Sequence, residues 1–525
     1  MAVTQILLAG NTARRTGERT NRIDRQSSVS SLSHLPKVIQ SISCPALTMT
    51  DQHFLDNIWR TLGTWGRYQR IQMALHMATY GSEAFQLMII VFIGYRPSYQ
   101  CADLGNTTSM YDTLSNASLT PLYQACHVDI LINGTNTTLM KLSPCPAGYT
   151  YDLEKDRTFV TEWNLVCDGA ERAEISQMLL MIGQMVGAAL LPQLSDRFGR
   201  KLVLVTSHIV LFAAGVTASL APTFIVFAIM RFICGVSHQG VSMTRTVMTI
   251  ELLPAESRYM TEVLGVTFWT CGIIVIAPVA YLLRNLSWRN TYLIMTMYSA
   301  YSLVGYWLYH ESVRWLLAND KIEEAKAILK KAAKMNKVNE SDVLRIIDYA
   351  SSSQPLVLKQ DESGNTHDEK GERRREDIQD PSNSALPKYT VLTLFTRRRI
   401  AMITIIMSYT WAVNSLTYYG LVLSSASLPL DRYLSFLLLS LAEYPVAVIE
   451  YFTLNKFGRK RICILFHALA AVSLIAGTIA NYFSERAGAK IALMIFYFLG
   501  KLGISGSFST IFLLTPELYP TNLRE

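Results

Sequence analysis

The sequence contains few charged residues for its length. Of 525 residues, 17% are charged and 50% are hydrophobic, whereas about a quarter of the residues in a soluble protein are charged. Charge is missing chiefly from blocks of roughly 20 residues, the length that a helix needs to cross the hydrocarbon core of a bilayer. Inside lipid, each backbone polar group must be satisfied within its own segment, so these blocks are predicted to be helices. The composition therefore excludes a water-soluble globular protein and indicates an all-α membrane protein.

Several functional signatures are also missing. The sequence has no phosphate-binding loop of the form G-x-x-x-x-G-K-[ST], so an ATP-driven pump is not expected. It shows no cluster of metal ligands, and its histidines are expected to pack or to form hydrogen bonds. No apolar run near the beginning has the length of a signal-peptide core. We expect no enzymatic activity, cofactor, metal or nucleic-acid partner.

Ten apolar blocks predict ten membrane-spanning helices. The basic residues of the loops predict their orientation, because cytoplasmic loops are enriched in Lys and Arg. The 95–172 loop holds five basic residues and the 311–399 loop holds seventeen, so the first is predicted to be extracellular and the second cytoplasmic. The N-terminal segment 1–70 is then cytoplasmic, in a multi-pass protein of the plasma membrane. The ten blocks are 71–94, 174–193, 202–220, 222–243, 260–283, 290–309, 400–421, 432–453, 461–481 and 489–513.

The 95–172 loop has two features of an extracellular segment. Four N-glycosylation sequons fall within about 30 residues, and they begin at Asn106, Asn116, Asn133 and Asn136. Four cysteines in an oxidising compartment predict two disulfides, with three possible pairings left open; they are Cys101, Cys126, Cys145 and Cys167. The loop is also a candidate surface for contacts within a homo-oligomer.

The cytoplasmic 311–399 loop divides into two parts. Residues 321–334 have apolar side chains on one face and predict an amphipathic helix. Residues 351–387 are polar and highly charged and predict a flexible linker. The arginine-rich run within this linker is interpreted as a solvated or lipid-facing segment.

An internal repeat divides the chain into two halves. The sequence DRFGRK at 196–201 recurs as NKFGRK at 455–460, and ELLP at 251–254 recurs as ELYP at 517–520. Both motifs occur in the same order, as expected of a transporter built from two parallel repeats. The predicted domains are a six-helix bundle at 71–310 and a second bundle at 400–525. Because the second bundle contains four predicted helices, the repeat leads us to expect two further helices after the last residue.

These motifs resemble those of the major facilitator superfamily, in its organic cation, carnitine and organic anion transporter branch (solute carrier family 22-like). The resemblance extends from Gly66 to the last residue. It implies a major facilitator fold of two six-helix bundles, the second of them incomplete here. The sequence departs from the branch at Pro192, His310, Val313 and Asn455. The residues that carry the resemblance are 66–69, 162–167, 418–421 and 517–521.

The repeated loop motifs are candidate gating residues. Asp196 is predicted to cap a helix start, and Arg200 is predicted to pair with Glu251. The resemblance implies that such contacts close the cytoplasmic side and break as the two bundles rock. The alternative is that these residues only fix the topology. The candidates are Asp196, Arg197, Gly199, Arg200, Glu251, Arg258, Gly458, Arg459, Glu517 and Arg524.

Ionisable and aromatic residues within the predicted spans are candidate substrate-binding residues, because charge is costly in lipid and is usually functional there. Carboxylates with aromatic faces favour an organic cation or the cationic end of a carnitine-like zwitterion. The alternatives are transport of an organic anion or a sugar, and a truncated membrane partner that does not transport. The candidates are Glu443, Trp411, Tyr418, Tyr419, Glu83, Phe268, Trp269, Lys501 and Arg231.

Overall fold

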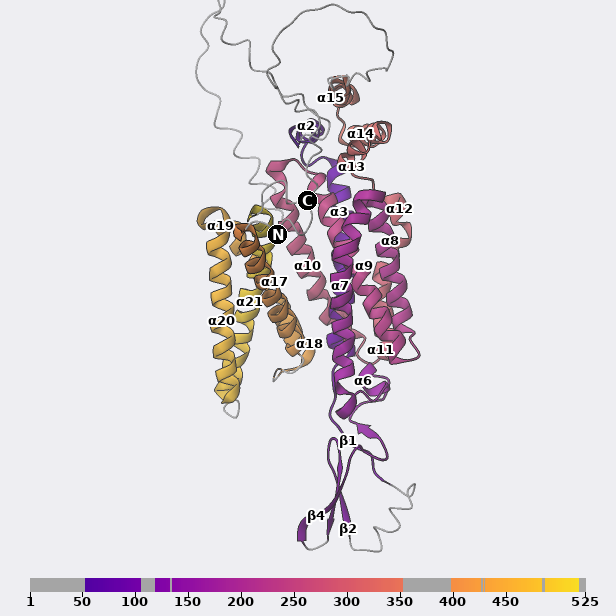
Figure 1. Cartoon of the computed structure of the whole chain (residues 1–525), viewed down its shortest axis with the longest axis vertical. Coiled ribbons are helices and arrows are strands. Elements are labelled where there is room, and N and C mark those ends of the chain that lie inside the picture. The colour runs from indigo at the N-terminus through magenta and orange to yellow at the C-terminus, as the bar shows by residue number, and fades with distance from the viewer. Residues whose placement is uncertain are drawn as a thin grey trace, which may run out of the picture. The chain divides into compact units, whose positions relative to one another are not determined.

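The computed structural model describes residues 52–104, 119–132, 135–352, 398–425, 428, 430–483 and 487–518. These residues lie within one compact unit that spans Thr48–Glu525. Helices form the membrane part, and short strands occur in the 95–172 loop (Figure 1). Eight helical segments are long and apolar enough to cross a membrane.

The helices of the first half coincide with the six predicted blocks. The first span is α3 (Arg67–Met88) followed by α4 (Ile90–Ile93), and the sixth is broken into α11 (Trp288–Met297), a 3-10 turn (Tyr298–Val304) and α12 (Gly305–Leu308). The first and sixth spans are not among the eight helical segments counted above. Helix α3 is rich in polar residues, and the sixth span is not one continuous helix. Between them lie α7 (Ala170–Phe198), α8 (Arg200–Ser219), α9 (Phe224–Glu251) and α10 (Tyr259–Leu282).

In the second half the eighth predicted span is interrupted. It consists of α18 (Arg432–Leu441) and α19 (Tyr444–Phe457), and Glu443 is the N-cap residue of α19. Pro445 lies in the first turn of α19, where its missing N–H costs little. Glu443 therefore lies midway along the eighth predicted span, at the turn between its two helical segments. The remaining helices are α17 (Arg398–Ser424), α20 (Arg459–Tyr482) and α21 (Ala487–Leu518).

Five short strands, which the sequence analysis did not predict, form two antiparallel sheets in the 95–172 loop. Of the three possible cysteine pairings, the structure contains Cys101–Cys145 and Cys126–Cys167. Asn106, Asn116, Asn133 and the side chain of Asn136 lie outside the described residues, so their glycosylation remains a prediction. The strands are β1 (Tyr99–Cys101), β2 (Leu119–Tyr123), β3 (Val128–Ile132), β4 (Thr135–Leu142) and β5 (Tyr149–Tyr151). The short helix α6 (Phe159–Glu162) follows them.

Four helices outside the spans share a separate hydrophobic core. The predicted amphipathic helix is present as α14 (Ile322–Asn336), with Ala325 and Leu329 buried on its apolar face. The sequence analysis missed α2, whose buried residues include Ile58, because this helix is short and lies in a polar segment. Most of the predicted 351–387 linker lies outside the described residues. The other three helices are α2 (Gln52–Leu62), α13 (Val313–Ala318) and α15 (Glu340–Ser352).

Glycines allow α7 and α9 to approach backbone to backbone. A Cβ atom added at Gly235 of α9 would lie 2.0 Å from the carbonyl oxygen of Leu180, and one at Gly183 of α7 would lie 2.2 Å from the carbonyl oxygen of Phe232. Helices in lipid associate largely through such close packing, because lipid tails are as apolar as their side chains. The α7–α9 contact therefore depends on these two glycines.

We predict that Gly235→Ala lowers the thermal stability of the detergent-solubilised protein. Over-packing of a well-packed core costs ~1–3 kcal/mol, and here the obstructing atom is a backbone carbonyl. Gly488→Ala is the matched control, because a Cβ atom at that position meets no atom within 4 Å. Equal melting temperatures for the two variants would contradict this account of the α7–α9 contact.

Candidate functional site

The loop motifs form the same backbone joint in both halves. Gly199 separates α7 from α8 with φ of 105°, and Gly458 separates α19 from α20 with φ of 83°. Residues with a Cβ atom rarely adopt this conformation. At Gly199 a Cβ atom would also lie 2.6 Å from a carboxylate oxygen of Glu311. Glycine is therefore required at the first joint by both backbone conformation and space.

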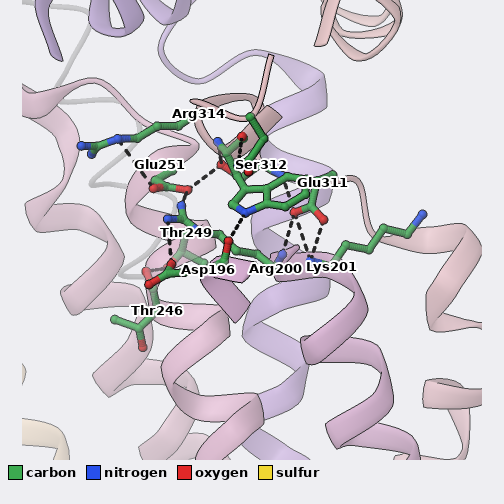
Figure 2. Close-up of polar contacts among 11 residues, drawn as sticks. Asp196, Arg200, Lys201, Thr246, Thr249, Glu251, Glu311, Ser312 and Arg314 are labelled. Carbon is green, nitrogen blue, oxygen red and sulfur yellow. Dashed lines mark hydrogen bonds and ion pairs between the residues drawn. The ribbon is translucent and has the colours of Figure 1, made fainter. Parts of the chain in front are cut away.

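The predicted contact between Arg200 and Glu251 is present. The two side chains form an ion pair whose members are 14% and 8% exposed. Glu251 also accepts a hydrogen bond of 2.5 Å from the hydroxyl of Ser312, and Arg314 Nε lies 4.0 Å from its other oxygen (Figure 2). This cluster ties the end of α9 to the start of α8 and to the segment before α13.

The prediction that Asp196 caps a helix start is wrong, because Glu311 does this. The carboxylate of Glu311 accepts hydrogen bonds from the backbone N–H groups of Arg200 and Lys201, at 3.1 Å each (Figure 2). These are unpaired amides at the positive end of α8, where a carboxylate is favourable. Asp196 instead lies in the last turn of α7, with its side chain 73% exposed and 3.6 Å from Arg200.

The other predicted gating residues are less closely connected. Arg258 pairs with Asp56 of α2 at 3.1 Å, and Arg197 lies over the neighbouring Phe198 ring at 5.4 Å. Arg459 lines a cavity of 270 Å³, whose wall includes Glu450 of α19. The side chain of Glu517 and the whole of Arg524 lie outside the described residues, so their roles remain predictions.

Glu83 pairs with a residue that the sequence analysis missed. Arg245 of α9 lies 2.5 Å from the Glu83 carboxylate, and both side chains are no more than 3% exposed. The guanidinium also lies 3.5 Å from the centroid of the Tyr80 ring. The sequence analysis ended the fourth apolar block at residue 243, whereas α9 continues to Glu251, so Arg245 was not considered as a charge within a span, where it requires a partner.

Glu443 lies at the centre of a second buried cluster. Lys501 Nζ of α21 is 2.8 Å from its carboxylate, and the Tyr418 hydroxyl donates to the same oxygen at 2.8 Å. The Lys501 ammonium also lies 3.2 Å from the centroid of the Tyr418 ring. Trp269 of α10 donates to the Tyr418 hydroxyl at 3.2 Å, which connects the cluster to the first half. The ring of Tyr419 also contacts that of Tyr418, with centroids 5.3 Å apart. We define the Glu443 cluster as the residues Glu443, Lys501, Tyr418, Trp269 and Tyr419.

The remaining substrate candidates lie outside the Glu443 cluster. Arg231 is fully buried and donates to the backbone oxygen of Gln86 at 2.7 Å and to the side chain of Gln177 at 2.6 Å. Phe268 is 41% exposed. Trp411 and Tyr418 of α17 both pack against Phe508, each with its ring centroid 5.5 Å away.

A cavity of 1140 Å³ lies between the two halves, at the end of the spans next to the 95–172 loop. Its first-half wall includes Gln177 of α7, and its second-half wall includes Tyr419 of α17 and Arg432 of α18. The ring of Tyr419 therefore borders the cavity on one side and contacts Tyr418 on the other. This places the Glu443 cluster directly behind the cavity wall.

The intramembrane histidines pack or form hydrogen bonds, as the sequence analysis expected, and His76 packs against the ring of Tyr309 at 5.0 Å. His208 contacts the hydroxyl of Ser82 at 3.1 Å and His238 contacts Gln184 at 3.0 Å. Within the part of the chain that the structure describes, no three His, Cys, Asp or Glu side chains gather into a metal site.

Comparison with known proteins identifies similar sequences and folds. A family model for "Sugar (and other) transporter" matches residues 98–525. The chain is 29% identical to an organic cation transporter-like protein of Drosophila melanogaster, over 88% of this chain and 79% of the relative. It is 30% identical to organic anion transporter 3 of Rattus norvegicus, over 74% and 67%, and 29% identical to solute carrier family 22 member 4 of Mus musculus, over 89% and 82%.

Among solved structures, the xylose transporter XylE of E. coli in a partially occluded inward-open conformation is similar in fold. The TM-score is 0.53, and the match covers 87% of this chain and 86% of XylE. At 16% sequence identity this likeness supports the helical fold alone.

We predict that the Arg200–Glu251 ion pair stabilises the protein. Arg200→Glu and Glu251→Arg are each expected to lower the melting temperature in detergent, because each leaves two like charges in contact. The double exchange should recover part of the loss, with a coupling energy of ~1–3 kcal/mol. Asp196→Asn is the control and should change stability by less than ~1 kcal/mol, since its carboxylate is exposed. Additive effects of the two exchanges would disprove the pairing.

Proposed function

Since the chain belongs to the sugar (and other) transporter family of the major facilitator superfamily, and is a multi-pass membrane transporter of the solute carrier family 22 type, we propose that it carries small organic cations or zwitterions by alternating access. The proposed location is the plasma membrane, with the N-terminal segment in the cytoplasm. The relatives include transporters named for organic cations and others named for organic anions, at similar identity. The choice of substrate charge therefore rests on the Glu443 cluster.

The observation that carries the proposal is the position of the Lys501 ammonium. It is held by a carboxylate on one side, 2.8 Å away, and by the face of the Tyr418 ring on the other, 3.2 Å from the centroid. A carboxylate and an aromatic face are the groups that recognise substituted ammonium ligands. We infer that the ammonium group of a substrate takes the place of Lys501 at Glu443 during transport.

Electrostatics favours a zwitterion for this exchange. Lys501 and Glu443 are 1% and 4% exposed, so separating them with a simple cation leaves a buried ammonium without a counter-charge. Breaking a buried pair in this way costs ~3–5 kcal/mol. A carnitine-like substrate would bring its quaternary ammonium to Glu443 and its carboxylate to Lys501. Each buried charge would then exchange one partner for another.

The large cavity provides the proposed route to this cluster. It lies beside the loop that carries the disulfides, and Tyr419 forms the wall between the cavity and the cluster. We propose that the opposite, cytoplasmic side is closed while the Arg200–Glu251 pair is formed and Glu311 holds the start of α8. We propose that these cytoplasmic contacts form the gate and that they open when the two halves rock. The Glu83–Arg245 pair is proposed to hold the first half together.

One observation supports an anionic substrate instead. Arg231 is buried, and the structure, over the ranges that it describes, places no carboxylate in an ion pair with it. Its partner Gln177 lines the large cavity. An organic anion could bind there with Lys501 as a second positive charge. Sugar transport and a role as a non-transporting membrane partner remain alternatives with no specific observation in their favour.

We predict that cells expressing the protein, with any further coding sequence included, take up radiolabelled carnitine. Glu443→Gln should abolish this uptake, because it removes the carboxylate that receives the quaternary ammonium. Lys501→Gln should affect carnitine more than tetraethylammonium, which has no carboxylate to bind. Surface expression is measured for each variant, and Glu323→Gln, on α14 outside the spans and with its side chain 89% exposed, serves as the matched carboxylate control.

Three results would refute this assignment. Unchanged uptake kinetics in Glu443→Gln would show that Glu443 does not bind the substrate. Uptake of para-aminohippurate without uptake of carnitine or tetraethylammonium would favour the organic anion alternative. Loss of para-aminohippurate uptake in Arg231→Gln would then identify Arg231 as part of the anion-binding site. If none of the three compounds is taken up at normal surface expression, the result would favour the alternative that the protein is a membrane partner that does not transport.

A further inference from the structure

Side chains from three separate elements meet where α12 ends. Lys331 of α14 donates from Nζ to Nε2 of His310, at 2.8 Å. Lys201 of α8 lies with its ammonium 4.0 Å from the centroid of the Tyr306 ring. The ring of His310 stacks on Tyr68 at 5.5 Å, which fixes its position. We call Lys201, Tyr306, His310 and Lys331 the Lys201–Lys331 cluster.

The cluster carries positive charge that its own residues do not neutralise. Burial first, and then the charges of Lys331 and Lys201, lower the pKa of His310 to about 4, so this ring is neutral and accepts from Lys331. Within the described ranges, no carboxylate lies within ion-pair distance of either ammonium. Glu311 directs its oxygens at the backbone amides of α8, and Figure 2 shows Lys201 extending away from it.

The surface around the cluster has the character of a membrane interface. The exposed side chains beside it are apolar or aromatic, and Trp307 is 74% exposed and Tyr306 53% exposed. Tryptophan and tyrosine gather at the depth of lipid headgroups, where one edge of the ring meets hydrocarbon and the other meets water. The neighbouring exposed residues are Leu202, Leu303, Val304 and Leu308. Two ammonium groups at this depth therefore face lipid phosphates rather than bulk water.

We propose that the Lys201–Lys331 cluster binds the phosphate of an anionic lipid headgroup. Lys201 and Lys331 come from α8 and α14, so one headgroup held by both ammonium groups joins a membrane-spanning helix to a cytoplasmic one. A phosphomonoester is the best match, because its charge of nearly −2 balances two lysines. The same chemistry is found in a soluble phosphate ion, which lacks the acyl chains that the exposed apolar rim would contact.

The test compares lipid binding by the full-length protein and its variants in detergent. Native mass spectrometry measures the retention of phosphatidylinositol 4,5-bisphosphate against phosphatidylcholine. The double variant Lys201→Gln/Lys331→Gln is expected to bind the bisphosphate roughly thirtyfold more weakly, from roughly fivefold per basic residue at a membrane surface. Lys201→Arg/Lys331→Arg should retain most of the binding. Lys330→Gln is the matched control, because Lys330 is an exposed neighbour on α14.

Several outcomes would overturn the proposal. Wild-type affinity in the double glutamine variant would exclude the cluster, and an equal loss in Lys330→Gln would indicate general attraction to positive charge. Stabilisation by inorganic phosphate to the same extent as by the lipid would indicate a soluble anion site. Melting temperatures in phosphatidylcholine show whether each variant is folded, and the single variants replace the double one if it is not. Because binding is measured without transport, this test is independent of the substrate proposal.

Discussion

A buried charge in a membrane requires a partner, and the structure of the spans is organised around this constraint. Glu83 lies against Arg245 within the first half, and Glu443 lies against Lys501 within the second. In each case an aromatic ring covers the cation, Tyr80 for Arg245 and Tyr418 for Lys501. Neither pair joins the halves, so each half can move as a body without breaking either of these two buried ion pairs.

Two contacts that the structure describes between the halves are of a different kind. Trp269 donates one neutral hydrogen bond to Tyr418, and Phe92 of α4 stacks on Tyr433 of α18 at 5.3 Å. Neutral hydrogen bonds and ring contacts cost much less to break than a buried ion pair. Contacts of this kind can break at low cost when two halves rock against each other, as in transporters built from repeats.

Much of the fold was predictable because the hydrophobic blocks report directly on helix length. The repeat also indicated the Gly199 and Gly458 joints, and charge complementarity indicated the Arg200–Glu251 pair. Glu311 was not predictable as the cap of α8, because it lies 111 residues from Arg200 in sequence and no local pattern relates them. The break at Glu443 was not recognised because the apolar pattern continues across it, although Pro445 marked the position. The strands of the 95–172 loop escaped prediction since they are short, and the core beneath them is small, with Val128 and Ile130 among its few buried residues.

The two disulfides interleave along the chain, because Cys126 lies between Cys101 and Cys145 while its partner, Cys167, lies beyond them. In the proposed orientation, Cys101 and Cys126 would enter the oxidising lumen first during synthesis, so the earliest bond available would be one that the final structure does not contain. Any such bond must be reshuffled by thiol–disulfide exchange before the loop is complete. Correct maturation would therefore depend on an isomerase of the secretory pathway, and a host without one would yield mispaired protein.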